Sequence, residues 1–309
     1  MIAFAYDARF LEHDMKDHPE CAGRLRSIMD YLQDAAISSQ LIQVKVSEAS
    51  EAELALIHNP QYIQSLQDFC KSGDQWIDAD TYVLPCSYDI ARLAVGAVLN
   101  AIKTVHQGLV KKAFCAVRPP GHHAASDMAM GFCLFNNIAI GARFIQKQKW
   151  GDKILIIDWD VHHGNGTQDI FWEDPSVGYV SVHRYPFYPG TGRADETGGV
   201  AAKGTLFNLP VSARTGIDEI LNRTEEMIQK AADQMRPDWI LISCGFDAYH
   251  KDPLGGLGFD AHSYARLTSF VGSIARCYAE GRVVSVLEGG YNQDALGPLV
   301  EAHLQALIM

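Results

Sequence analysis

Short apolar runs alternate with longer amphipathic segments along almost the whole chain. Runs such as Ile154–Ile157 and Ile240–Ile242 are continuously apolar and do not alternate between apolar and polar residues. Continuous runs indicate strands that are buried on both faces, which is typical of parallel sheets in α/β proteins. The pattern predicts strands at Ile2–Tyr6, Leu41–Val46, Ala113–Val117, Lys153–Ile157, Val177–Val182, Thr205–Leu209, Trp239–Ser243 and Arg282–Leu287.

The amphipathic segments between these strands predict helices. They cover Cys21–Ala36, Pro60–Cys70, Ser87–Gly108, Phe135–Gln148, Gly216–Met235, Ala261–Ala279 and Asp294–Ile308. The alternation predicts an α/β fold with a central, mostly parallel sheet of about eight strands and helices on both sides. No repeat, low-complexity tract or Pro/Gly/Ser-rich linker divides the chain, so we expect a single domain over residues 1–309.

Composition and charge exclude several classes of protein. Hydrophobic residues make up 48% and charged residues 20%, values that argue against a disordered chain. The 26 basic and 37 acidic residues give a net charge of −11, so we expect no direct binding of nucleic acid. The sequence has no apolar run of about 18 residues and no leader-like N-terminus, so we expect a cytoplasmic protein without a membrane span. The seven cysteines include no CxxC pair and are expected to be reduced.

Polar, often glycine-containing clusters follow five of the predicted strands. Val117 runs into RPPGHHA, Ile157 into DWDVHHGNG, Val182 into HRYPFYPGTG, Ser243 into CGFDAYH and Leu287 into EGGY. Open α/β sheets place their sites outside the carboxyl ends of the strands. We therefore expect the five clusters to converge on one crevice.

The cluster that follows Ile157 suggests a metal site. Residues two apart on an extended segment share a face, so Asp158, Asp160 and His162 would point the same way. Two carboxylates and an imidazole are costly to desolvate together unless a cation neutralises them. Asp247 follows another apolar strand and would complete the three protein ligands of a catalytic zinc site with Asp160 and His162. A solvated polar strand end is the alternative.

His122 and His123 follow two prolines and a glycine, which stiffen and then turn the chain. Because neighbouring side chains diverge, the pair suits general acid–base work better than joint ligation of one metal. Tyr291 follows two glycines after the last strand, where a phenol could donate to a developing oxyanion. A pair of surface histidines and a packed loop tyrosine are the alternatives.

Taken in order, RPPGHHA, GFCLFNN, DWDVHHGNGTQ, YPGTG, GFDAYHKDPLGG and EGGY resemble the histone deacetylase and acetylpolyamine amidohydrolase superfamily. The stretch DHPECAGRL near the N-terminus is similar as well, and the resemblance covers nearly the whole chain. GNGTQ and GFDA are more similar to the class II branch and its bacterial relatives than to class I. The resemblance implies the arginase–deacetylase fold.

The resemblance also implies a role for each matching residue. Zinc would be bound by Asp160, His162 and Asp247, although carboxylate–imidazole sites also accept iron or cobalt. The catalytic residues would be His122, His123 and Tyr291, with Asp158 and Asn165 as the partners of the two histidines. Many members have an aspartate where this chain has Asn165. Without that negative charge His123 should stay more neutral, which suits a general base.

Further positions match ion-binding and substrate-binding residues of the family. A structural potassium ion would be held, partly through backbone carbonyls, by Asp158, Asp160, His162, Ser181 and Val182. Phe132 and Tyr188 would form the walls of an acyl-lysine channel that Gly131 and Gly289 also line. Asp80, or alternatively Asp78, would be the rim acid that holds the substrate backbone. Leu254 stands where polyamine-selective members have a glutamate.

The implied function is zinc-dependent removal of acetyl or other short acyl groups from acyl-lysine in proteins or peptides, by attack of a water molecule. Deacetylation of acetylpolyamines or other small acetylated amines is the alternative within the family. Two other classes stay open, a two-manganese ureohydrolase of the same fold and a non-catalytic acetyl-lysine binding module. The natural substrate and any oligomeric state also stay open.

Overall fold

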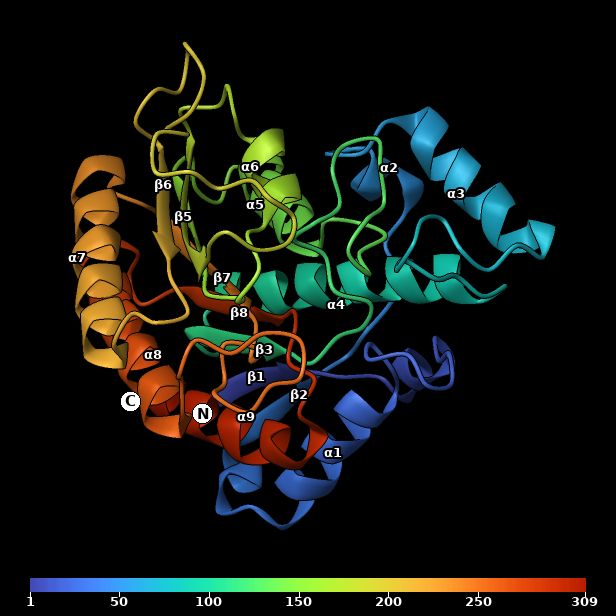
Figure 1. Cartoon of the computed structure of the whole chain (residues 1–309), viewed down its shortest axis with the longest axis horizontal. Coiled ribbons are helices and arrows are strands. Elements are labelled where there is room, and N and C mark those ends of the chain that lie inside the picture. Colours follow the sequence, from blue (N-terminus) through green and yellow to red (C-terminus); the bar gives the residue numbers. More distant parts are fainter.

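A computed structural model describes residues 1–309, and its centre is an eight-stranded sheet (Figure 1). The strands pair in the order β2-β1-β3-β8-β7-β4-β5-β6, and every pair is parallel. This confirms the predicted sheet. The strands are β1 (Ile2–Ala5), β2 (Leu41–Val44), β3 (Lys112–Cys115), β4 (Ile154–Asp158), β5 (Val177–Arg184), β6 (Leu206–Val211), β7 (Trp239–Cys244) and β8 (Val283–Leu287).

Helices cover both faces of the sheet (Figure 1). α1, α9, α8 and α7 pack side by side along one face, whereas α4 and α5 pack on the other. The α-helices are α1 (Gly23–Asp34), α2 (Glu51–Leu54), α3 (Pro60–Ser72), α4 (Ser87–His106), α5 (Asn137–Lys147), α6 (Asn165–Ile170), α7 (Ile217–Met235), α8 (Ala261–Tyr278) and α9 (Gln293–Ile308). Two 3-10 helices, Ala8–Glu12 and Ala36–Gln40, precede α1 and β2.

Two short helices, α2 and α6, were not among the predicted elements. They have four and six residues, too few to display a helical hydrophobic period. α2 nevertheless begins with a capping box, in which Ser50 and Glu53 satisfy each other's backbone N–H groups. That spacing is the one signal in the sequence that could have located α2.

The apolar core is one continuous cluster of 87 buried residues that lies on both sides of the sheet. β3, β4, β7 and β8 are buried along their whole length, as the continuous apolar runs of β4 and β7 predicted for those two strands. Such continuity is what one domain requires, and the single domain over residues 1–309 stays our prediction. No helix of the chain is long and apolar enough to cross a membrane.

The order of the strands brings the polar clusters together. The five clusters follow β3, β8, β7, β4 and β5, which are consecutive neighbours in the sheet. Because all pairs are parallel, the five carboxyl ends lie along the same edge of the sheet. The crevice expected from the sequence is therefore at this edge.

Candidate active site

A cavity of about 250 Å³ lies at the carboxyl edge of the sheet. Its volume is small and its walls are largely aromatic, which suits one extended side chain better than a bulky ligand. It is lined by Asp80, Pro120, His122, His123, Gly131, Phe132, His162, Phe187, Tyr188, Leu254, Gly289 and Tyr291. All six substrate-binding residues expected from the sequence are among them, whereas Asp78 is not.

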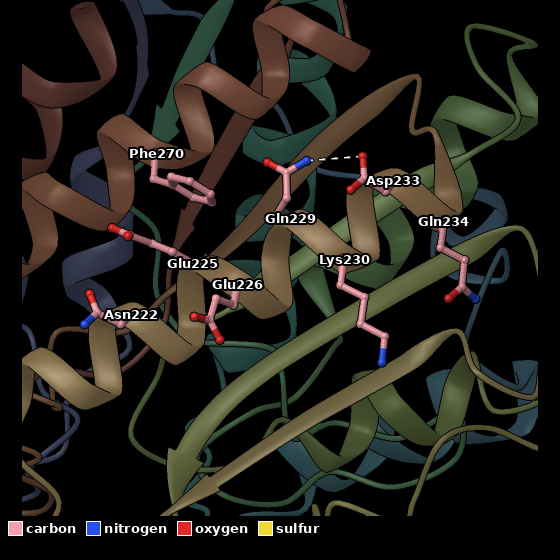
Figure 2. A pocket seen from close by; sticks show the side chains of 8 residues that line it. All are labelled: Asn222, Glu225, Glu226, Gln229, Lys230, Asp233, Gln234 and Phe270. Atoms are coloured by element: carbon pink, nitrogen blue, oxygen red, sulfur yellow. Dashed lines mark hydrogen bonds between the residues drawn. The ribbon is translucent and has the colours of Figure 1, made fainter.

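A wider hollow on the surface lies elsewhere and carries no comparable chemistry (Figure 2). Its volume is about 860 Å³, and all of its lining side chains except Phe270 come from the outer face of α7. Glu225 is paired with Arg266, and Gln229 donates to Asp233. The groove is the solvated face of a helix.

Three metal-ligand side chains converge at the cavity: Asp160, His162 and Asp247 offer ligand atoms that all lie within 4.8 Å of one another. Nδ1 of His162 is 3.1 Å from Oδ1 of Asp160 and 3.1 Å from Oδ2 of Asp247. Both carboxylates are buried. The three residues predicted as ligands therefore form one compact cluster.

The chain reaches this arrangement through bends and not through the extended segment that the sequence suggested for residues 158–162. Strand pairing of β4 ends at Asp158. Beyond it, Oδ1 of Asp158 accepts the N–H of Asp160 at 3.1 Å, and Oδ1 of Asp160 accepts the N–H of His162 at 2.9 Å. Side-chain carboxylates thus take over backbone N–H groups that the sheet leaves free. As a result Asp160 and His162 face Asp247, whereas Asp158 faces His122.

Backbone groups hold the two carboxylates in place. The N–H of Val161 donates to Oδ1 of Asp247, and the N–H of Gly289 donates to Oδ2 of Asp160, each at 2.8 Å. A Cβ atom at Gly289 would lie 2.2 Å from Oδ2 of Asp247, so this position admits only glycine without a shift of the site. Outer contacts of this kind orient metal ligands.

The electrostatics of the cluster fit a cation. Burial and the neighbouring Asp160 carboxylate raise the pKa of Asp247. Burial alone would lower the pKa of His162, but its hydrogen bonds to Asp160 and Asp247 raise it. The three groups compete for positive charge, which a divalent ion supplies more fully than one proton. Two carboxylates and an imidazole suit zinc, and also iron or cobalt.

The tandem histidines have different partners. Nδ1 of His122 is 3.0 Å from Oδ2 of Asp158, and that same oxygen accepts the hydroxyl of Tyr179 at 2.9 Å. Nδ1 of His123 is 2.8 Å from Oδ1 of Asn165. An amide oxygen only accepts hydrogen bonds, so His123 carries its proton on Nδ1 and keeps a lone pair on Nε2.

These partners separate the protonation of two rings whose centroids are 4.0 Å apart. Burial alone would lower the pKa of His122, but the Asp160 and Asp158 carboxylates outweigh it and raise this pKa to about 10. Burial lowers the pKa of His123, and the positive charges of His122 and His162 lower it further. Without the metal, His122 is therefore cationic and His123 neutral, as the sequence suggested for His123.

Tyr291 contacts both an aromatic ring and a cation. Its ring centroid is 5.9 Å from that of Phe132, and the guanidinium carbon of Arg24 lies over its ring, 4.9 Å from the centroid. Burial raises the pKa of Tyr291 well above its usual value. The phenol thus stays protonated and can donate a hydrogen bond.

The predicted channel walls lie directly beside the histidines. The Tyr188 ring meets the His123 ring edge-on, with centroids 5.2 Å apart. A Cβ at Gly131 would lie 2.5 Å from Cδ2 of His123, so a larger residue there would press on that ring. Phe187 stacks on His162 at 5.3 Å and also lines the cavity. Sequence reasoning missed Phe187, although it lies within the HRYPFYPGTG cluster.

The two rim acids have distinct positions. Asp80 lines the cavity, and its carboxylate accepts the hydroxyl of Thr81, which in turn accepts the N–H of Phe132. Asp78 is exposed, and its Oδ1 accepts the N–H groups of Asp80 and Thr81. Asp78 therefore shapes the turn that presents Asp80.

Three of the residues expected around a potassium ion, Asp158, Ser181 and Val182, lie on neighbouring strands, whereas Asp160 and His162 lie beyond the end of β4. Asp158 at the end of β4 pairs with Ser181 on β5, and Val182 follows. Nε2 of His183 donates to a carbonyl, so its Nδ1 accepts the Ser181 hydroxyl at 2.9 Å and leaves the lone pairs of that hydroxyl free. Potassium binding stays a prediction.

Glu288 is a buried residue of the site that sequence reasoning missed. Its Oε2 accepts the N–H groups of Gly121 and His122 at 2.7 and 3.2 Å, and its Oε1 accepts the hydroxyl of Ser243 at 2.9 Å. It thus connects the ends of β8, β3 and β7. The signal was available, since Glu288 follows a buried, mostly apolar strand just as the Asp247 cluster does.

Comparison with known proteins decides the family. Residues 18–307 match the model of the histone deacetylase domain. This chain belongs to the histone deacetylase family. It is 35% identical over 316 residues to histone deacetylase 15 of Arabidopsis thaliana, a match that covers 99% of this chain and 56% of the relative. The chain therefore spans about half the length of that plant relative.

Two other similar proteins are matched over a larger share of their own length. A probable deacetylase of Archaeoglobus fulgidus is 35% identical over 301 residues, covering 96% of this chain and 83% of the relative. The crystal structure of the HDA15 HD domain matches with a TM-score of 0.94 and 36% identity, covering 99% of this chain and 90% of that one. The resemblance found in the motifs and the arginase–deacetylase fold are thereby confirmed.

Proposed function

We propose that this member of the histone deacetylase family hydrolyses the side-chain amide of acetyl-lysine in peptides or proteins, at a site that holds one zinc ion. The observation that carries the proposal is the position of the Asp160, His162 and Asp247 cluster. His162 lines a narrow aromatic cavity together with the two tandem histidines and Tyr291. Ligands, proton carriers and a neutral hydrogen-bond donor therefore face one small space.

The bound ion would polarise the acyl carbonyl and make the attacking water more acidic. His123 has a free Nε2 and accepts the proton of that water. His122, whose Nδ1 is 3.0 Å from Oδ2 of Asp158, lies beside it and acts as its electrostatic partner. Tyr291 donates to the carbonyl oxygen as charge develops there. The proton on His123 then passes to the leaving amine, so no covalent acyl-enzyme is required.

The walls of the cavity favour a lysine stem. Phe132 and Tyr188 would contact its four methylene groups and keep water away from them. Leu254 at the mouth offers an apolar surface where a polyamine would require a carboxylate. Asp80 is the one carboxylate that lines the cavity, and we assign it to the substrate backbone.

Two other classes of function are less well supported. A two-metal ureohydrolase needs a second set of ligands, but the only cluster of at least three metal-ligand residues in the chain is this triad. A non-catalytic binding module would have lost a ligand, a histidine or the tyrosine, and all are in place. Potassium binding and a cytoplasmic location stay predictions.

Substrate choice tests the proposal directly. The kcat/KM of the protein is measured on an acetyl-lysine peptide and on N8-acetylspermidine, with the metal content known. We expect the peptide to be the better substrate and Leu254→Glu to shift the preference toward the polyamine. Leu109→Glu adds the same charge at a residue that is 69% exposed and does not line the cavity, so it is the control. A clear preference of the unaltered protein for the polyamine would reject acetyl-lysine as the substrate.

A further inference from the structure

One carboxylate, that of Asp252, ties together two loops at the mouth of the cavity. Its Oδ1 accepts the N–H of Leu254 at 2.9 Å. Its Oδ2 accepts the N–H groups of Tyr291 and Asn292 at 2.7 and 3.1 Å. The side chain of Asn292 donates back to the carbonyl of Lys251 at 2.8 Å. The segment 251–254 and the start of α9 therefore form one hydrogen-bonded unit.

The two residues that the carboxylate holds sit next to flexible backbone. Gly290 has a φ of +119° directly before Tyr291, and Gly256 has a φ of +87° shortly after Leu254. Glycine at such positions leaves the chain many alternative conformations. A separate anchor is therefore needed if both side chains are to keep one position.

No lysine or arginine side chain forms an ion pair or a hydrogen bond with Asp252, so its direct hydrogen-bond partners are backbone N–H groups. Hydrogen bonds from backbone N–H groups to a carboxylate are stronger than those to a neutral acceptor. The substitution Asp252→Asn removes this charge and also turns one acceptor atom into a donor. At least one of the three contacts must then be lost.

We infer that Asp252 is a positioning residue that holds Tyr291 and Leu254 in a fixed position relative to each other. It aims the phenol at the acyl oxygen and fixes the apolar wall at the rim as parts of one unit. The inference rests on the proposed function, because it takes Tyr291 to act on the acyl group. Arg24, which donates to the carbonyl of Gly290 at 2.6 Å, supports the same loop from within the protein.

A double-mutant cycle separates this role from a general effect on folding. In the otherwise unaltered protein, Asp252→Asn is expected to lower kcat on an acetyl-lysine peptide by roughly ten- to a hundredfold, with a smaller change in KM. In a Tyr291→Phe background the same substitution should change kcat by less than about twofold, because the group that it positions is already absent. Equal losses of kcat in the two backgrounds would overturn the inference.

A matched control is available at the opposite end of β7. Oδ2 of Asp238 accepts the consecutive N–H groups of Asp152 and Lys153 at 2.8 and 2.9 Å, the same pattern that Asp252 forms with Tyr291 and Asn292. Asp238→Asn should therefore leave kcat within about twofold in both backgrounds, as expected for a site that does not couple to the chemistry. A loss of kcat in Asp238→Asn comparable to that in Asp252→Asn would overturn the specific role.

Hydrogen exchange tests the anchor without using activity. Asp252→Asn should speed the exchange of the amides of Tyr291 and Asn292 by at least about tenfold and leave the amides of β4 unchanged. Unchanged exchange at Tyr291 would overturn the inference even if kcat falls. A protein that shows the faster exchange but never hydrolyses acetyl-lysine would retain the anchor and reject the proposed function.

Discussion

Nδ1 of His123 donates a hydrogen bond of 2.8 Å to the amide oxygen of Asn165. The base of the proposed reaction therefore has a neutral hydrogen-bond partner. The neighbouring His122 is hydrogen-bonded instead to a carboxylate, that of Asp158. Two adjacent rings of the same chemical type thus have partners of different charge. Changing the partner of His123 should therefore change the pH dependence of the reaction.

Replacing Asn165 by aspartate should move that pH dependence. A carboxylate next to His123 favours its protonated form and raises its pKa, typically by one unit or more. Because the reaction needs neutral His123, the acidic limb of the kcat/KM profile should shift to higher pH by about one unit. Asn222→Asp adds the same charge on the exposed face of α7 and should leave the limb in place. An unmoved limb in Asn165→Asp would remove His123 from the role of base.

Tyr291→Phe should reduce kcat strongly while substrate binding is largely retained. The phenol is neutral, lines the cavity and is proposed to meet the carbonyl oxygen only as charge develops there. Loss of one such donor lowers kcat on the order of 10²- to 10³-fold. Steady-state kinetics on an acetyl-lysine peptide measure the effect. A kcat within about threefold of the unaltered protein would exclude Tyr291 from the chemistry.

Gly289→Ala should weaken metal binding. The added Cβ would lie 2.2 Å from Oδ2 of Asp247 and 2.6 Å from Oδ2 of Asp160, so both carboxylates must move. Displaced ligands and their supports lower metal affinity roughly 10- to 100-fold. Zinc retained after dialysis against a graded series of chelators measures this. Gly216→Ala, with no atom within 4 Å of the new Cβ, is the control, and equal zinc retention in the two variants would contradict the prediction.

Buried histidines away from the cavity should make the protein sensitive to acid. His303 is buried between the hydroxyls of Thr268 and Ser285, and burial lowers its pKa to about 3. An unfolded histidine has a pKa of about 6.5, so between these values the unfolded chain binds a proton that the folded one does not. The contribution of neutral His303 to the free energy of unfolding is fully present above this window. It is lost as the pH falls through the window, by up to about 1.4 kcal/mol per pH unit for one group.

The slope of the unfolding free energy between about pH 4 and 6 measures this effect. His303→Gln should reduce this slope by the amount that corresponds to about one bound proton. His262→Gln, at an exposed position of α8, should leave the slope unchanged. His13 and His58, also buried, have pKa values lowered by burial to about 3 and about 4, so some slope should remain in the variant. An identical slope in His303→Gln and the unaltered protein would contradict the account.

Local patterns were enough to locate the sheet and the metal-ligand triad. β4 and β7 contain continuously apolar runs, Ile154–Ile157 and Ile240–Ile242. Carboxylates seldom follow such runs without a partner, so Asp160 and Asp247 indicate a site. Because the strands are parallel, residues far apart in sequence meet at one edge. The triad could therefore be predicted without knowledge of the strand order.

The supports of the site could not be predicted in the same way. Arg24 donates to the carbonyls of Glu288 and Gly290, and Asp252 accepts from Tyr291, through contacts with backbone atoms. Backbone atoms are common to every residue type, so the sequence carries no sign of which partner is chosen. The bends after Asp158 were missed for a related reason, since they depend on where strand pairing stops.

The central claim is hydrolysis of acetyl-lysine with one metal ion per chain, and a metal titration tests it most directly. Metal-free protein is titrated with zinc while turnover of an acetyl-lysine peptide and bound zinc are measured on the same samples. We expect no turnover without metal and a linear rise that ends at one zinc per chain, as the single triad requires. Turnover by the metal-free protein, or a rise that continues to two ions per chain, would contradict the account.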